Sequence, residues 1–163
     1  AKMFRHILSP YAEKCLKSYA LLFIENLNEE MQIEAVKYNA YSIEYIKNPS
    51  ERVQIEAVKY SAHAIKYIKN PSEAVKMEAV KNFGYAIKHI KNPSEEMQMI
   101  AIKQNEYTIQ YIKKPTKRVQ IEAVKSNGFV IEYIKNPFED LKKVSKEIEK
   151  VWRQIQQIKN LII

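Results

Sequence analysis

Five prolines divide the middle of the chain into segments of equal length, and this spacing constrains the fold more than any other feature. Successive prolines are 22 residues apart without exception, and four of the five follow an asparagine, the departure being Lys114. A fixed period of this length is typical of a repeat protein, in which each unit packs against its neighbours. The prolines are Pro49, Pro71, Pro93, Pro115 and Pro137.

The repeat covers most of the chain and predicts how it is organised. NPSERVQIEAVKYSAHAIKYIK, residues 48–69, is followed by three variants of the same unit, and residues 26–47 match it with Leu27 in place of proline. Five units therefore span 26–135. We expect an N-terminal half-repeat cap in 1–25, a different C-terminal segment in 136–163, and one domain over the whole chain.

Each unit is predicted to form two short helices. The Asn-Pro-Ser-Glu sequence at 48–51 is typical of a helix start, with Asn48 as the N-cap. The first helix should end near Ser61, where other units place Asn and Gly, residues that suit a helix C-terminus. A second helix is expected over 63–69. Helices this short are marginal alone, so the units must stack, and we predict an all-α fold, an α-solenoid.

The residues that carry most enzyme chemistry are scarce. Gly84 and Gly128 are the only glycines and Asp140 is the only aspartate. Phosphate-binding loops need glycine, and two-metal phosphoryl chemistry usually needs several carboxylates. The three histidines and Cys15 lack neighbours that would complete a metal or nucleophile site. We therefore expect no catalytic residue, no metal, no cofactor and no enzyme activity.

The short paired helices, the NPSE opening and the AVK-x-N core resemble the short tandem helical repeats of unknown function in phage, giant-virus and bacterial proteins. They are also similar to leucine-rich-variant and HEAT-like repeats. The likeness covers about 110 of the 163 residues. It implies a protein-binding platform, an adaptor or inhibitor. The viral association implies a host-interaction or counter-defence role.

Composition favours an intracellular protein with a negatively charged partner. The chain has 27 basic and 19 acidic residues, a net charge of +8, which is compatible with an acidic protein or a nucleic acid. A single cysteine excludes an intrachain disulfide and favours a reducing compartment. No apolar run approaches the roughly 18 residues of a membrane span. We expect a cytoplasmic location, in the host cytoplasm if the protein is viral, and no membrane partner.

Two rows of lysines recur once per repeat. The first row, here called the helix lysines, closes the first helix, and a glutamate three residues earlier often accompanies it as a potential ion-pair partner. The second row, the turn lysines, closes the second helix. Either row can be a solvated helix face or a ladder that contacts a polyanion. The helix lysines are Lys37, Lys59, Lys81, Lys103 and Lys125, and the turn lysines are Lys47, Lys69, Lys91, Lys113 and Lys135.

A row of aromatic side chains accompanies the lysines on the second helices. Each repeat carries two, four residues apart, which an α-helix would direct the same way. Packing between repeats explains such a row, and so does an interaction surface, because tyrosine combines a large area with a polar end. The pairs are Tyr41 and Tyr45, His63 and Tyr67, Tyr85 and His89, Tyr107 and Tyr111, and Phe129 and Tyr133.

These rows give the candidate binding surface. It is centred on the second and third repeats, 48–91, which carry a net charge of +4. A protein partner with an acidic patch is the leading hypothesis. Nucleic-acid or nucleotide-phosphate binding is the alternative, which four arginines in the chain disfavour. The candidate residues are Lys59, Lys69, Lys81, Lys91, Tyr67, Tyr85, His63, His89, Tyr107 and Tyr111.

A row of glutamines and the C-terminal segment complete the pattern. Gln32, Gln54, Gln98 and Gln120 recur among apolar neighbours, and we expect their amides to hydrogen-bond between repeats. From Leu141 onward, apolar residues are spaced by three and four, a heptad pattern. One helix there could cap the fifth repeat, and its overhanging part could pair with a second copy or another partner. The candidate association residues are Trp152, Ile155 and Ile158.

Overall fold

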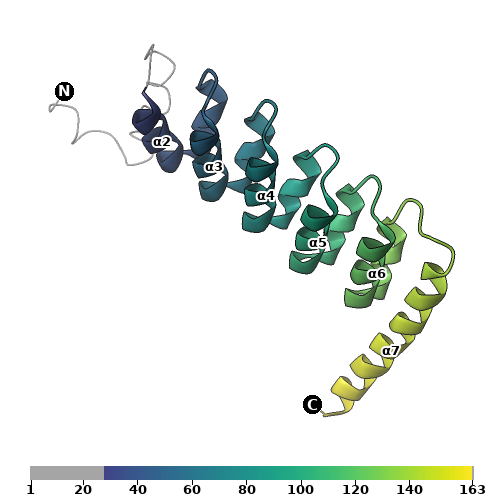
Figure 1. The fold of residues 1–163 in the computed structure, drawn as a ribbon. Helices are drawn as coiled ribbons and strands as arrows, with labels where there is room; N and C mark the ends of the chain where they lie inside the picture. The colour runs from purple at the N-terminus through teal and green to yellow at the C-terminus, as the bar shows by residue number, and fades with distance from the viewer. Residues whose placement is uncertain (1–27, 163) are drawn as a thin grey trace. The chain divides into compact units, whose positions relative to one another are not determined.

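The computed structural model describes residues 28–162, and within this range every regular element is a helix and no strand occurs. Five α-helices are each followed by a 3-10 helix, and a long helix, α7 (Leu141–Ile162), comes after them (Figure 1). This confirms the predicted all-α solenoid. The cap predicted in 1–25 lies outside the described residues. The pairs are α2 (Glu29–Tyr38) with η1 (Ala40–Tyr45), α3 (Glu51–Tyr60) with η2 (Ala62–Tyr67), α4 (Glu73–Asn82) with η3 (Gly84–His89), α5 (Glu95–Gln104) with η4 (Glu106–Tyr111), and α6 (Lys117–Ser126) with η5 (Gly128–Tyr133).

The described residues divide into two compact units, 28–82 and 83–162. In the first unit α2, α3 and α4 lie side by side, and η1 lies beside η2. In the second, α5, α6 and α7 lie in sequence, and η3, η4 and η5 form a neighbouring row. Each unit therefore has a layer of α-helices and a layer of 3-10 helices, and equivalent positions of successive repeats form rows.

The second helix of every repeat is a 3-10 helix of six residues. In η1, the backbone N–H of Ser42 donates to the carbonyl of Asn39 at 2.9 Å, an i to i+3 bond. The Asn39 side chain also accepts from the N–H of Tyr41 at 3.1 Å, which caps the first turn. Six residues between extended residues at both ends hold fewer than two α-helical turns, so the tighter helix satisfies more backbone groups.

The first helix of each repeat is capped by the residue after the proline, so the predicted N-cap was wrong. Ser50 is the N-cap of α3, and its hydroxyl accepts from the N–H of Val53 at 3.3 Å. Asn48 instead has a φ of 50°, in the left-handed region that asparagine tolerates better than most side chains. Asn70 and Asn92 share this conformation. Asparagine thus recurs before proline because it tolerates the left-handed backbone conformation at that position.

The core runs through both layers. Val53 and Val58 of α3 are fully buried, and Ile65 and Ile68 at η2 are at most 7% exposed. In a 3-10 helix, residues three apart lie on the same side, which explains why these two isoleucines share the buried face. Alanines recur where neighbouring backbones approach, and each is completely buried: Ala57, Ala79, Ala101 and Ala123.

Both glycines lie just after the end of a first helix, as predicted, and both allow close approach between elements. Neither has a positive φ, and each begins a 3-10 helix. A Cβ on Gly84 would lie 3.1 Å from the Cα and the carbonyl oxygen of Ala101 in α5. A Cβ on Gly128 would lie 3.1 Å from the carbonyl oxygen of Ser145 in α7. Backbone atoms cannot move aside as a flexible side chain can, so a larger residue would separate the elements.

Gln54, Gln98 and Gln120 hold the turn of their own repeat, whereas the prediction was that such amides pair with one another between repeats. The Nε2 of Gln54 donates to the carbonyl of Pro49 at 2.9 Å. Gln98 and Gln120 make the same bond to the proline that precedes them. The Oε1 of Gln120 also accepts from the N–H of Phe138, after the fifth repeat. The proline carbonyl at the start of each helix is partly buried and needs a donor, which a glutamine five residues later supplies.

Candidate interaction surfaces

Two of the helix lysines are neutralised within their own helix. The Nζ of Lys37 lies 3.1 Å from the Oε1 of Glu34, and the Nζ of Lys59 lies 3.0 Å from the Oε1 of Glu56. The ion pair with Glu34 raises the pKa of Lys37. These pairs are the i,i+3 contacts of a solvated helix face. Lys59, a candidate binding residue, is therefore already partnered, and Lys81 lies at the equivalent position of α4.

The turn lysines differ because none has a carboxylate within ion-pairing distance in the described part of the chain. All five are exposed, in the turn between each 3-10 helix and the next proline. A lysine without an acidic partner leaves its charge available to a ligand. Among the predicted lysines, Lys69 and Lys91 belong to this row.

Turn lysines border two open hollows, one in each compact unit. The first, about 480 Å³, is lined by Lys47, Lys69, Tyr45 and Tyr67, together with the carboxylate-bearing Glu44. The second has a volume of about 360 Å³. It is the more basic of the two, and its lining includes Lys88, His89, Lys91, Tyr111, Lys113 and Lys114.

The second hollow brings together predicted residues and adds others. His89, Lys91 and Tyr111 were predicted, whereas Lys88, Lys113 and Lys114 were not among the candidates. Lys113 could have been found from its place in the turn row, and Lys114 from its replacement of the asparagine that precedes the other prolines. Their proximity to Lys91 depends on the register between repeats three and four, which the sequence periodicity alone does not give.

The aromatic row runs between repeats. Tyr41 contacts Tyr67 of the next repeat with ring centroids 5.7 Å apart and an edge-to-face angle of 74°. Tyr85 with Tyr111, and Tyr107 with Tyr133, form the same contact at 5.8 and 5.6 Å.

The expectation that the two rings of one repeat point the same way was wrong. Residues four apart in a 3-10 helix differ by about 120°, so the first ring of one repeat meets the second ring of the next.

These rings both support the stack and remain accessible. Tyr41 and Tyr111 are 42% and 39% exposed, although each packs against another tyrosine. The ammonium of Lys66 lies 4.4 Å from the centroid of the Tyr67 ring, and interaction with the Tyr67 side chain raises the pKa of that lysine. Of the candidate histidines, His63 is half-buried on η2 and His89 is exposed at the end of η3.

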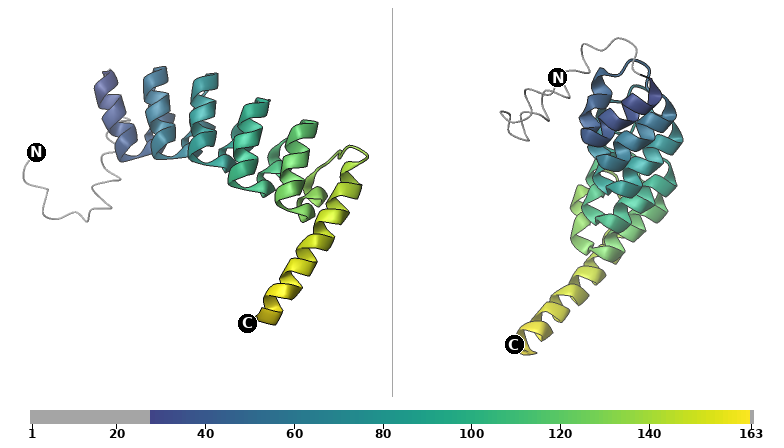
Figure 2. Two further views of the ribbon diagram at one scale, coloured as in Figure 1. Left: turned by 60° about the horizontal axis from the view of Figure 1, so that its bottom comes forward. Right: turned by 90° about the vertical axis from the view of Figure 1, so that its left-hand side faces the viewer.

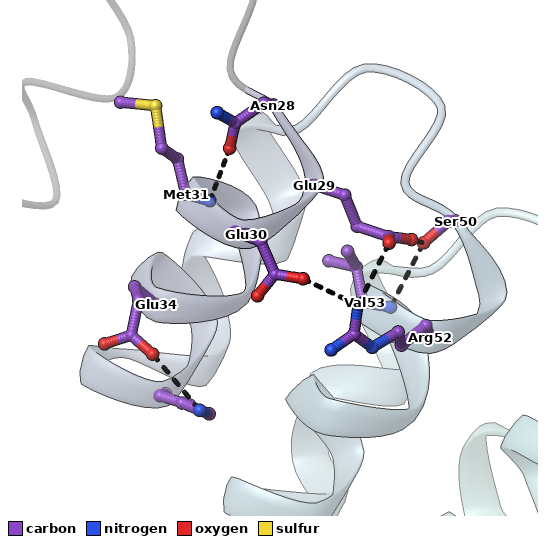
Figure 3. Close-up of polar contacts among 9 residues, drawn as sticks. Asn28, Glu29, Glu30, Met31, Glu34, Ser50, Arg52 and Val53 are labelled. Atoms are coloured by element: carbon purple, nitrogen blue, oxygen red, sulfur yellow. Dashed lines mark hydrogen bonds and ion pairs between the residues drawn. The ribbon is translucent and has the colours of Figure 1, made fainter.

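The arginines of the described residues all pair with glutamates. Arg52 contacts Glu29 at 3.2 Å and Glu30 at 2.7 Å, joining α3 to α2 (Figure 3). Arg118 lies 3.5 Å from Glu95 of the preceding repeat, and Arg153 lies 3.6 Å from Glu149 within α7. The guanidinium groups at these positions therefore serve contacts within the protein.

The long helix α7 packs on the last repeat through its first half. Leu141 is fully buried and Ser145 is 1% exposed, and the Ser145 hydroxyl donates to the carbonyl of Gly128 at 2.8 Å. The second half continues past the repeat (Figure 2, left). Trp152, Ile155 and Ile158, the predicted association residues, are 41%, 40% and 56% exposed.

A further hollow of about 490 Å³ lies beside the second half of α7. Phe129 and Trp152 contribute aromatic surface to it, and Glu106, Asn127 and Gln156 contribute polar groups. The guanidinium carbon of Arg153 lies 6.0 Å from the centre of the Phe129 ring. The hollow lies where a sixth 3-10 helix would follow η5 if the repeat continued.

No group of three or more potential metal ligands occurs within residues 28–162. Within the same residues, no helix is both long enough and apolar enough to cross a membrane. Comparison with known proteins gives no match to a family model, to a curated protein or to a solved structure. The regularly spaced α and 3-10 helices are compatible with a helical repeat.

Proposed function

We infer that this protein is a non-enzymatic repeat scaffold that binds an extended, acidic segment of another protein along its turn lysines and tyrosines. The supporting observation is the contrast between the two lysine rows. Lys37 and Lys59 are paired with glutamates of their own helices, whereas the turn lysines lack such partners and border hollows next to half-exposed tyrosines. An anionic ligand therefore meets unneutralised charge on the surface of the turns.

The spacing of the repeats defines the kind of ligand. Neighbouring helices lie about 8–10 Å apart, and a chain in the polyproline II conformation advances about 3.1 Å per residue with three residues per turn, so every third side chain faces the same way. A ligand in this conformation with an acidic side chain at every third position therefore presents one carboxylate to each turn lysine of one compact unit. The tyrosine rings between the lysines supply apolar contact and phenolic hydroxyls, a combination common in protein interfaces.

Single-stranded nucleic acid is the second candidate, and the half-exposed tyrosines beside lysines favour it. The arginines weigh against it. Arg52, Arg118 and Arg153 are held by glutamates, so a phosphate backbone would meet lysines without the bidentate contacts that arginine provides. For this reason the acidic protein segment is preferred.

The experiment compares two double variants that remove the same charge from the same part of the chain. Lys47→Gln with Lys69→Gln changes the turn lysines of the first compact unit, and Lys37→Gln with Lys59→Gln changes the helix lysines of that unit, which are paired with glutamates. The probe is a fluorescent, proline-rich peptide of about nine residues with glutamate at every third position. A peptide of the same composition with clustered glutamates and a single-stranded oligothymidylate are measured alongside it.

The turn variant should bind the spaced peptide about tenfold more weakly than the unchanged protein, and the helix variant within about twofold. Equal losses in both variants would show that the overall charge is responsible, and the absence of binding to either peptide would also reject the proposal. Tighter, salt-sensitive binding of the oligothymidylate would favour the second candidate.

A more specific proposal about the partner rests on the resemblance to phage and giant-virus repeats. On this proposal, the protein is an adaptor or inhibitor that acts on a host or defence protein in the cytoplasm. Affinity purification from the native host, with and without nuclease, tests this proposal. A partner retained by the unchanged protein and the helix variant but lost by the turn variant supports it, whereas a partner released by nuclease points to nucleic acid.

A further inference from the structure

The side chains of α7 are divided among three faces. One face, with Leu141 and Ser145, packs on the last repeat. A second carries lysines and is exposed. A third is an exposed apolar stripe, turned by about 90° from the packed face at 3.6 residues per turn. The lysine face consists of Lys142, Lys143, Lys146 and Lys150, and the apolar stripe consists of Val144, Val151, Ile155 and Ile158.

The apolar stripe has no partner within the described chain. Its four side chains are 41%, 51%, 40% and 56% exposed, in sequence order. They extend over about 21 Å of helix, at a rise of about 1.5 Å per residue. A contiguous apolar surface of this kind normally marks an interaction site.

The charges around the stripe indicate what covers it. The lysine face lies about 135° away, and Glu147, Gln154 and Trp152 flank the stripe. From Val151 to Ile158, Arg153 is the only charged residue, and Glu149 pairs with it at 3.6 Å. Within residues 151–158, an acidic partner would therefore find no unpaired positive charge beside the stripe. A second copy of the stripe, in contrast, meets an apolar surface without facing like charges.

We propose that two copies of this chain associate through their α7 stripes in an antiparallel pair. A two-fold axis near Val151 places Val144 of one copy beside Ile158 of the other, so the full stripe is covered on both. Glu147 of one copy then lies near the neutral Gln154 of the other. The last repeat packs on the first half of α7, so an antiparallel pair keeps the last repeats of the two copies at opposite ends, whereas a parallel pair brings these basic repeats together.

The association is tested by sedimentation of the full chain over about 1 µM to 1 mM, a range that suits a short helix pair. The mass should rise toward twice that of one chain. Val151→Gln with Ile158→Gln should remain monomeric throughout and keep its melting temperature at low concentration, because the stripe has no role inside one chain. Lys143→Gln with Lys150→Gln, the same change on the lysine face, should associate like the unchanged chain.

Several results would overturn the proposal. A monomer at every concentration, or equal association of both variants, shows that the stripe does not pair. A melting temperature lowered by the stripe substitutions in a monomer shows that the stripe packs within its own chain. Orientation is tested in a Cys15→Ser background, where a mixture of Val144→Cys and Ile158→Cys chains should form a mixed disulfide. A disulfide between two Ile158→Cys chains would indicate a parallel pair instead.

Discussion

The junction between repeats and the junction between the last repeat and α7 begin in the same way and then diverge. At the first, Gly84 lies against the backbone of Ala101 in α5, and at the second Gly128 lies against the backbone of Ser145 in α7. Ser145 is 44 residues after Ala101, two full repeats, so α7 starts as a sixth first helix. The repeat register persists beyond Pro137, although the expectation was that it ends there.

The difference arises about one turn after Ser145. Asn105 and Asn127 are extended and cap a 3-10 helix, with side chains that accept from the N–H two residues on. The equivalent residue in α7 is Glu149, which remains helical, and α7 continues to Ile162. A glutamate is a better helix former than asparagine and lacks its short capping side chain. This position thus distinguishes α7 from α5 and α6, whereas α3 and α4 end before the equivalent Ser61 and Phe83 without a capping side chain.

Replacement of Gly84 or Gly128 should lower the stability of its junction more than any other substitution. Gly84→Leu should lower the free energy of unfolding by about 3 kcal/mol, because its side chain meets the backbone of Ala101. Gly128→Leu should cost less, since α7 can leave the last repeat without dividing the stack. Chemical denaturation measures both, and Glu106→Leu, at the equivalent position of η4, is the control. A cost at Gly128 as large as that at Gly84 would show that α7 is as integral as a repeat.

The fold could be predicted from the sequence further than the candidate surfaces could. The proline spacing and apolar positions such as Val53 and Ile65 define stacked units. The sequence could not distinguish an α-helix from a 3-10 helix over six residues, because periods of 3.6 and 3.0 barely differ at that length. Nor could it choose between Asn48 and Ser50 as N-cap, since both residue types cap helices and the backbone conformation decides.

The surfaces depend on contacts between repeats, which limits prediction further. The Lys59–Glu56 pair is local and could be anticipated from its spacing. Arg52 reaches Glu29 across 23 residues, and Tyr85 meets Tyr111 across 26, one repeat plus four positions. The periodicity gives the step of 22, whereas the extra offset follows from the twist of a 3-10 helix.

Removal of the Ser145 hydroxyl should have the next largest effect. Ser145→Ala leaves the buried carbonyl of Gly128 without its donor and should cost about 1–2 kcal/mol. Ala123→Ser, at the equivalent position of α6, is the matched reverse change: it buries a hydroxyl where no partner is built in, and should also destabilise. Denaturation of the two variants tests whether the polar bond is particular to the α7 junction. An unaffected Ser145→Ala protein would show that packing alone holds α7.

Restoring the repeat residue in α7 should have a smaller effect. Glu149→Asn with Lys150→Gly reproduces the Asn-Gly pair found at 127–128, and glycine inside a helix costs about 1 kcal/mol. The second half of α7 should lose helicity and exchange its amides faster, while the first half remains protected by Leu141. Hydrogen exchange measures this directly. Uniform protection along α7 in the variant would mean that position 149 does not decide where a repeat ends.

Lowering the pH should weaken the junction between the first two repeats, because Glu29 becomes protonated. This is the smallest of the expected effects. A hydrogen bond from the Ser50 hydroxyl, and secondarily the Arg52 guanidinium, hold the pKa of Glu29 below its ordinary value (Figure 3). A carboxylate whose pKa is lowered by folding stabilises the protein above its ordinary pKa, and this contribution is lost as the pH falls through the lowered folded value. Because the side chain is exposed, the contribution is small.

The melting temperature of the unchanged chain should therefore fall more between pH 6 and about pH 3 than that of Glu29→Gln, which lacks the titrating group. Asp140→Asn is the comparison at α7, where the carboxylate of the residue just before the helix lies 3.7 Å from Lys143 in its first turn and does not join two helices. That variant should follow the unchanged chain. If Glu29→Gln also follows it, the charged contact with Ser50 and Arg52 adds nothing to the junction, and the repeats are held by the buried alanines and valines alone.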